Sequence, residues 1–234
     1  MNLYPQFIKL TFAARMNFSK SIWFLIKKDL LIEWRQRYAF NGIILYLASV
    51  VFLIYVSFME LKPEMWLTLF WIVMLFTSVN AVAKSFLQEG RARWLYYYSI
   101  ASPYAIIVAK MIYNLSLMLI LCIIGLIIYS VVLGNPLLHP YYFLLVVILG
   151  SFSFSLTFTL MSALASKAGN SAMIMPILSF PIVVPILLLL VKLSREALYG
   201  GILEWPLKDF ALLISLDAVM LVMAMLLFPF LWRD

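Results

Sequence analysis

Asp217 is the one acidic residue that lies well inside a strongly apolar run of this sequence. An ionisable side chain at such a depth in a membrane is costly and often functional, as part of a proton relay or a substrate path. Proton-coupled transport usually needs several such groups, and the other apolar runs offer no Arg, Lys or His partner. Two interpretations therefore stay open: an intramembrane polar site, or an acid that is held neutral or bonded to Ser or Asn on a neighbouring helix.

His139 and Cys122 are the single histidine and the single cysteine of the chain. As an axial haem ligand His139 is a weak candidate, because one histidine per chain is a thin basis for a haem site. Its neighbours Pro140 and Tyr141 favour a turn residue at the membrane interface. A lone Cys122 excludes an intrachain disulfide and a cysteine-based metal site. We therefore expect no metal and no cofactor bound by this chain.

The motifs of common enzyme classes are missing from the sequence. It contains no GxxxxGK[ST] loop for ATP and no HExxH zinc site, and no GxSxG turn that would expose a nucleophilic serine. Intrinsic catalysis is therefore not expected. Any active process must draw its energy from a partner or from a gradient.

Composition places the chain among membrane proteins. Of its 234 residues 66% are hydrophobic and 12% are charged, and the mean hydropathy is +1.06. A span needs about 20 apolar residues to cross about 30 Å of hydrocarbon. The sequence thus predicts an all-α, polytopic membrane protein whose 39–234 region forms one six-helix domain. The predicted spans are 40–58, 65–83, 111–133, 142–165, 171–191 and 210–231.

The first 38 residues are predicted to form an N-terminal segment in the cytosol and the membrane interface. Within it, residues 18–38 read as a basic amphipathic helix that is too charged to span. Its predicted apolar stripe has a spacing of four: Ile22, Ile26, Leu30 and Trp34. One interpretation is a positive flank that only sets topology. The other is an elbow helix that touches a cytosolic partner through Lys28, Glu33, Trp34, Arg35 and Arg37.

The interval 84–110 is charged, amphipathic and mostly basic, and it lies between the second and third predicted spans. A polar segment held between two spans is a place where a soluble partner can grip a membrane protein. We expect it to be a coupling segment that docks an ATPase. The residues expected to make that contact are Phe86, Leu87, Gln88, Glu89, Gly90, Arg91 and Arg93.

The distribution of basic residues predicts the orientation. With both termini in the cytosol, the outer segments hold four of the 17 Lys and Arg residues: Lys62, Lys192, Arg195 and Lys208. Such a bias is typical of cytosolic termini. It also accounts for the net charge of +7 without a nucleic-acid partner. The first residues lack a signal-peptide pattern, and Met1 and Met16 both remain candidate starts.

Two of the predicted spans carry unusual residues. The fourth has small polar residues at spacings of three and four, which predict a seam for close helix packing. The fifth contains three prolines, so we expect it to be kinked and shielded by neighbours. The residues concerned are Ser151, Ser155, Thr159, Ser162 and Ser166 in the fourth span, and Pro176, Pro181 and Pro185 in the fifth.

Several segments together resemble the haem exporter protein B (CcmB) family, from about Ile26 to the end of the fifth span and more loosely beyond. The basic stretch from Lys28 to Arg37 is similar to the segment that leads into the family's first span. So are Ser102-Pro103 followed by Ala109-Lys110, and Phe180-Pro181 followed by Val184-Pro185. The coupling segment departs from the family, because it has Glu89 alone with Arg91 and Arg93 where acids are usual.

The resemblance implies a six-span permease like those of ABC exporters, in the bacterial inner membrane, that acts in haem delivery for cytochrome c maturation. It implies a CcmA-like ATPase that carries the ATP, CcmC- and CcmD-like membrane subunits and a second copy of this chain, with haem as a candidate substrate. Two alternatives stay open. One is an ABC-2-type permease that exports a lipid, polysaccharide or drug, and the other is a non-transporting membrane scaffold.

Overall fold

The computed structural model describes residues 18–35, 37–58, 60–87, 102–167, 171–199 and 206–233. These residues form helices and their connections, without a strand, and six of the helices are long and apolar enough to cross a membrane. The all-α, six-span prediction is therefore confirmed. The helices are α2 (Phe18–Arg35), α3 (Arg37–Ser57), α4 (Pro63–Leu87), α6 (Pro103–Leu133), α7 (Pro140–Lys167), α8 (Ser171–Arg195) and α9 (Leu207–Arg233).

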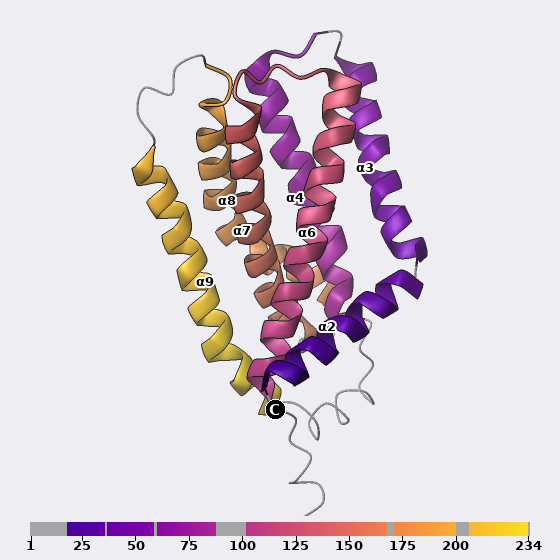
Figure 1. Ribbon diagram of the computed structural model, residues 1–234, viewed down its shortest axis with the longest axis vertical. Helices are drawn as coiled ribbons and strands as arrows, with labels where there is room; N and C mark the ends of the chain where they lie inside the picture. The colour runs from indigo at the N-terminus through magenta and orange to yellow at the C-terminus, as the bar shows by residue number, and fades with distance from the viewer. Residues whose placement is uncertain are drawn as a thin grey trace, which may run out of the picture.

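The six long helices stand side by side as a bundle, and α2 crosses one end of it obliquely (Figure 1). The carboxyl-terminal end of α9 lies at the same end as α2. The start of α4, the turn between α6 and α7, and the start of α9 lie at the opposite end. This arrangement agrees with a basic helix that lies along one membrane face while six spans cross the bilayer.

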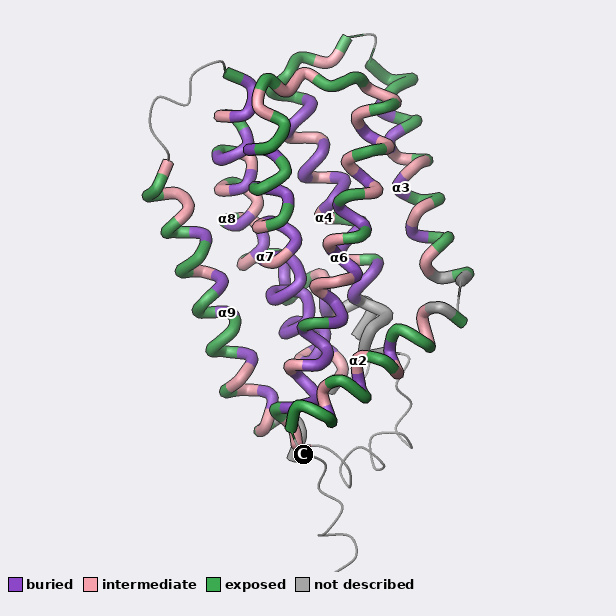
Figure 2. Tube along the Cα trace, viewed as in Figure 1, coloured by how far each residue is buried: buried purple, intermediate pink, exposed green. Residues whose placement is uncertain are grey.

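Helix α7 is the centre of the bundle, since it packs against α4, α6, α8 and α9. It is purple along much of its length in Figure 2, which marks buried residues. The predicted seam is confirmed for four of its five residues: Ser151, Ser155, Thr159 and Ser162 are buried, and Ser166 is half-buried. Two of these hydroxyls reach the backbone of neighbouring helices, because Ser155 Oγ and Ser162 Oγ each lie 3.5 Å from a carbonyl oxygen, of Met111 and Val82 respectively. Small side chains thus let α7 approach α4 and α6 closely.

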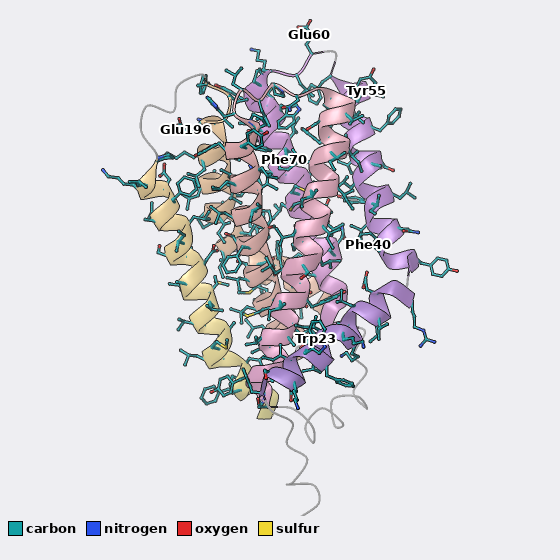
Figure 3. All side chains as sticks on the ribbon, viewed as in Figure 1. Trp23, Phe40, Tyr55, Glu60, Phe70 and Glu196 are labelled. Carbon is teal, nitrogen blue, oxygen red and sulfur yellow. The ribbon has the colours of Figure 1, made fainter. Side chains whose placement is uncertain are left out.

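Aromatic side chains from α4, α6 and α7 pack against one another in the half of the bundle that lies away from α2. Trp66 and Phe70 of α4 stack with ring centroids 6.0 Å apart, and Tyr129 of α6 meets Trp66 edge-on at 4.9 Å. Phe70 points into the interior of the bundle (Figure 3). The Trp66 indole donates to the Gly134 carbonyl at 3.0 Å, and the Tyr129 hydroxyl donates to the Trp66 carbonyl at 3.1 Å. The buried Trp66 and Tyr129 side chains therefore keep their polar atoms bonded.

Helix α6 begins earlier than predicted. The third span was expected at Met111, but the helix starts at Pro103. Ser102 is its N-cap and accepts a hydrogen bond from the Ala105 backbone N–H at 3.3 Å, and Pro103 occupies the first turn, where no backbone donor is needed. The prediction placed the start too late because Lys110 was interpreted as a residue outside the apolar span.

The expected shielding of the proline-rich helix is wrong for two of its three prolines. Pro181 and Pro185 of α8 are exposed on the bundle surface, as is the neighbouring Phe180. The buried residues of α8 recur at spacings of three and four, and include Val183 and Ile186. Pro181 lies two positions before Val183, so the exposed prolines lie away from the face that packs on α7.

Candidate functional site at the junction of α2 and α6

A buried ion pair joins α2 to the first turns of α6. Lys110 Nζ lies 3.2 Å from Asp29 Oδ2, and the two side chains are 6% and 7% exposed. Lys28 Nζ lies 2.9 Å from the other oxygen, Asp29 Oδ1. Both oxygens of this carboxylate therefore face a cation. Such pairing is what makes a buried carboxylate tolerable, because each charge loses its hydration on burial.

A second polar contact lies one helical turn further along the same junction. The Tyr113 hydroxyl donates to Glu33 Oε2 at 3.0 Å. Glu33 follows Asp29 by four residues and Tyr113 follows Lys110 by three, so both pairs lie on the facing sides of the two helices. Lys110 Nζ also lies 5.9 Å from the centroid of the Tyr113 ring, within the range of a cation–π contact. Together these contacts fix the register of α2 on α6.

The face by which α2 packs differs from the predicted apolar stripe. Its buried residues are Ser21, Leu25 and Asp29. Ile22 and Ile26 are half-buried at the edge of this face, and Leu30 is 49% exposed. The predicted apolar stripe is therefore not the face that packs on α6, because Asp29 lies on the packing face through its ion pair with Lys110. Asp29 can be buried because it pairs with Lys110 on α6. A pattern within α2 alone cannot reveal that partner.

The residues expected in the elbow helix do not share one environment. Lys28 forms an ion pair with Asp29, and Glu33 accepts a hydrogen bond from Tyr113. Arg35 is exposed at the end of α2. Trp34 and Arg37 belong to α2 and α3, but their side chains lie outside the described residues, and contact with a cytosolic partner remains a prediction.

Part of the predicted coupling segment lies outside the described residues, namely Gln88, Glu89, Gly90, Arg91 and Arg93. Phe86 and Leu87 are the last residues of helix α4, and their side chains lie outside the described part of the structure.

The two described ends of that segment are held in the bundle. On the α4 side, the Val82 carbonyl lies within hydrogen-bonding reach of Ser162 on α7. On the α6 side, Ser102 caps the helix and Lys110 is paired with Asp29. The helices on either side of the segment are therefore joined to α7 through α4 and to α2 through α6.

A groove of about 580 Å³ opens where α2, α3 and α6 meet. Phe40, Leu117 and Ile120 contribute apolar walls, while Glu33 and Tyr113 contribute polar atoms. Phe40 lies near the start of α3, close to where that helix meets α2 (Figure 3). The groove thus shares two residues with the α2–α6 junction, so any movement of α2 on α6 changes its shape.

Asp217 is buried in the bundle at 4% exposure. Its Oδ2 lies 2.9 Å from Ser153 Oγ of α7, which matches the interpretation of an acid bonded to a serine on a neighbouring helix. A second buried polar pair lies on α6 and α7, where Asn114 Nδ2 donates to Thr159 Oγ1 at 2.8 Å. In the described part of the bundle, Asp217 shares no ion pair within 4.0 Å with a Lys or Arg side chain. Its role in a relay or a substrate path remains a prediction.

His139 directly precedes α7, and the turn between α6 and α7 lies at the end of the bundle away from α2 (Figure 1). The His139 backbone N–H, like that of Leu138, donates to the Ala197 carbonyl at 3.0 Å, so the turn is tied to the end of α8. Its Nε2 atom is buried without a hydrogen-bond partner among the described residues. No cluster of three metal-ligating side chains occurs in the described ranges. The interfacial-turn interpretation fits this position, and the haem-ligand role is untested.

Asp29, Lys110 and Tyr113 are the members of this junction that sequence reasoning missed as site residues. The available signal was an acid within a basic helix and a lysine at the beginning of an apolar run. Each is unfavourable alone in a membrane, and opposite charges of this kind favour a mutual pair.

The comparisons with known proteins gave one result. A family model described as CcmB protein matches residues 20–231, which include most of α2 and most of α9. The search of curated proteins and the search of solved structures found no match.

Proposed function

Because the chain belongs to the CcmB protein family, we propose that it is the membrane-spanning permease subunit of an ABC transporter that delivers haem for cytochrome c maturation. The observation that carries this proposal is the family match over residues 20–231, combined with six spans in one bundle. The molecule is a multi-pass membrane protein, and haem would be its substrate and not a resident cofactor.

The energy would come from a separate CcmA-like ATPase. The chain has no phosphate-binding loop of its own, and the basic segment between α4 and α6 is the proposed contact for the ATPase. ATP-driven closure of two nucleotide-binding subunits would displace this segment, and α4 and α6 would tilt with it. The Asp29–Lys110 pair would carry α2 along, because it fastens α2 to the first turns of α6.

The proposed assembly contains CcmC- and CcmD-like membrane subunits and a second copy of this chain, since two nucleotide sites imply two six-span halves. Its proposed place is the bacterial inner membrane with both termini in the cytosol. The basic residues of α2 support this orientation, because Lys and Arg collect on the cytosolic side.

Purification of the tagged chain from detergent-solubilised membranes tests the proposal. We expect an ABC ATPase to co-purify, and deletion of the chain to abolish c-type cytochromes while b-type cytochromes remain. Retention of c-type cytochromes in the deletion strain would refute the haem-delivery role. Absence of an ATPase from the purified complex would refute the permease role.

A further inference from the structure

If Asp217 is charged, its surroundings contain more hydrogen-bond acceptors than hydrogens available for donation. Ser153 Oγ lies 2.9 Å from Asp217 Oδ2 and 3.1 Å from the Leu149 carbonyl oxygen. Both neighbours are acceptors when Asp217 is ionised, and a serine hydroxyl has one hydrogen to donate. A charged Asp217 would therefore leave one of these two close contacts without a hydrogen.

A proton on Asp217 Oδ2 resolves that shortage. The acid then donates to Ser153 Oγ, and Ser153 donates to the Leu149 carbonyl. Oδ1 becomes the carbonyl oxygen of a neutral acid, and this atom is buried without a partner among the described residues. An unbonded carbonyl oxygen costs far less in a buried site than an unbonded carboxylate oxygen, whose charge would be uncompensated. Thr157 Oγ1, one turn from Ser153 on α7, is likewise buried without a partner.

The described charged groups on the helices that pack against α9 do not compensate Asp217. Lys110 of α6 is paired with Asp29, and Lys192 of α8 is paired with Asp209. Arg195 is exposed at the end of α8. Apart from Lys110, the described titratable groups of α6 and α7 that are buried in the bundle are thiol and phenol groups: Tyr113, Cys122, Tyr129 and Tyr142.

From this geometry we propose that Asp217 is a proton-binding site: its carboxyl group is neutral in the closed bundle and donates a hydrogen bond from Oδ2 to Ser153. The bound ligand is a proton, and no other reactant is needed. Separation of α9 from α7 would admit water and let the acid ionise, so proton binding favours the closed α7–α9 seam. This proposal does not depend on which molecule the protein transports.

Infrared spectroscopy of the protein at pH 7, in a detergent without ester or carboxyl groups, tests the site. A neutral carboxyl group gives a carbonyl stretching band that shifts in heavy water, whereas an ionised carboxylate does not absorb there. We expect the wild type to show this band and Asp217→Asn to lack it. Asn keeps a donor to Ser153, so this variant should insert and fold. Asp209→Asn, which changes the acid paired with Lys192, is the matched control and should keep the band.

A second variant keeps the test decisive if Asp217→Asn fails to insert. Ser153→Ala removes the acceptor of the proposed hydrogen bond, so the band should remain and move to higher frequency. The proposal is overturned if wild type lacks the band at pH 7, if Asp217→Asn retains it, or if Ser153→Ala leaves its frequency unchanged.

Discussion

Lys110 Nζ lies 3.2 Å from Asp29 Oδ2 and joins helix α2 to a span from which it is separated in sequence by two other spans. Removing one partner of a buried pair costs about 3–5 kcal/mol when the remaining charge stays buried without compensation. Because Lys28 Nζ still lies 2.9 Å from Asp29 Oδ1, we expect Lys110→Ala to lower the free energy of unfolding by about 3 kcal/mol, the low end of that range, measured by thermal unfolding in detergent.

Comparison of the double variant Asp29→Ala with Lys110→Ala against the single variants measures the interaction energy between the two residues. The double variant should recover part of the loss, because neither charge is left alone. Lys192→Ala is the matched control: its pair with Asp209 is 64% exposed on the lysine side and should cost about 0–1 kcal/mol. Equal losses for Lys110→Ala and Lys192→Ala would contradict the buried-pair description.

Tyr113→Phe removes the hydroxyl that donates to Glu33 and keeps the ring. Hydrogen bonds to charged groups contribute about 1.5–3 kcal/mol to stability, and this contribution is smaller here because Glu33 is partly exposed. We expect a loss of about 1 kcal/mol in stability in the same assay. Tyr199→Phe removes a comparable but exposed hydrogen bond to Glu64, a bond that raises the pKa of Tyr199. This control should change stability less, and a larger effect there would argue against the Tyr113 contact.

Gly150→Ala tests the packing of α7 on α4. A Cβ atom at Gly150 would meet the ring of Trp71, whose indole is held by a 2.8 Å hydrogen bond to Ser194 Oγ. Overpacking of this kind costs about 1–3 kcal/mol. Gly42→Ala in α3 is the control, since a Cβ there meets no atom within 4 Å. It should be neutral or raise stability by up to about 1 kcal/mol. Equal thermal stability of both variants would refute the close approach.

Charge reversal at Arg91 and Arg93 tests the proposed coupling segment. Replacing both by Glu should reduce the amount of ATPase that co-purifies, because two attractive charges become repulsive, while membrane insertion stays intact. Reversal of Lys62, which precedes α4, and Lys208, at the start of α9, to Glu is the matched control and should leave co-purification unchanged. An unaltered yield of ATPase with the Arg91 and Arg93 variant would argue against docking at this segment.

The bundle was predictable from sequence because its determinants are local. Apolar runs set the spans, and the spacing of Ser151, Ser155 and Thr159 indicates a face that can pack closely. The family was also recognisable, since its segments occur in order along the chain.

The α2–α6 junction was not predictable by the same means. Asp29 and Lys110 each read as a surface residue, and burial becomes favourable only when two distant segments meet. The same mistake displaced the predicted start of α6 to Met111, because a paired lysine does not mark the limit of a helix. In α8, the prediction considered the lost donors of Pro181 and Pro185 but not the spacing of the residues that pack on α7.

The central position of α7 has a consequence for synthesis of the chain. Its packing partners α4 and α6 precede it in sequence, and α8 and α9 follow it. The first three spans are therefore synthesised before α7. Aromatic rings such as Phe70 lack a packing partner until α7 is in place, when the ring centroid of Phe143 lies 5.3 Å from that of Phe70. Nascent chains that stop before α7 would lack the interior of the bundle and should be the ones that membrane proteases remove first.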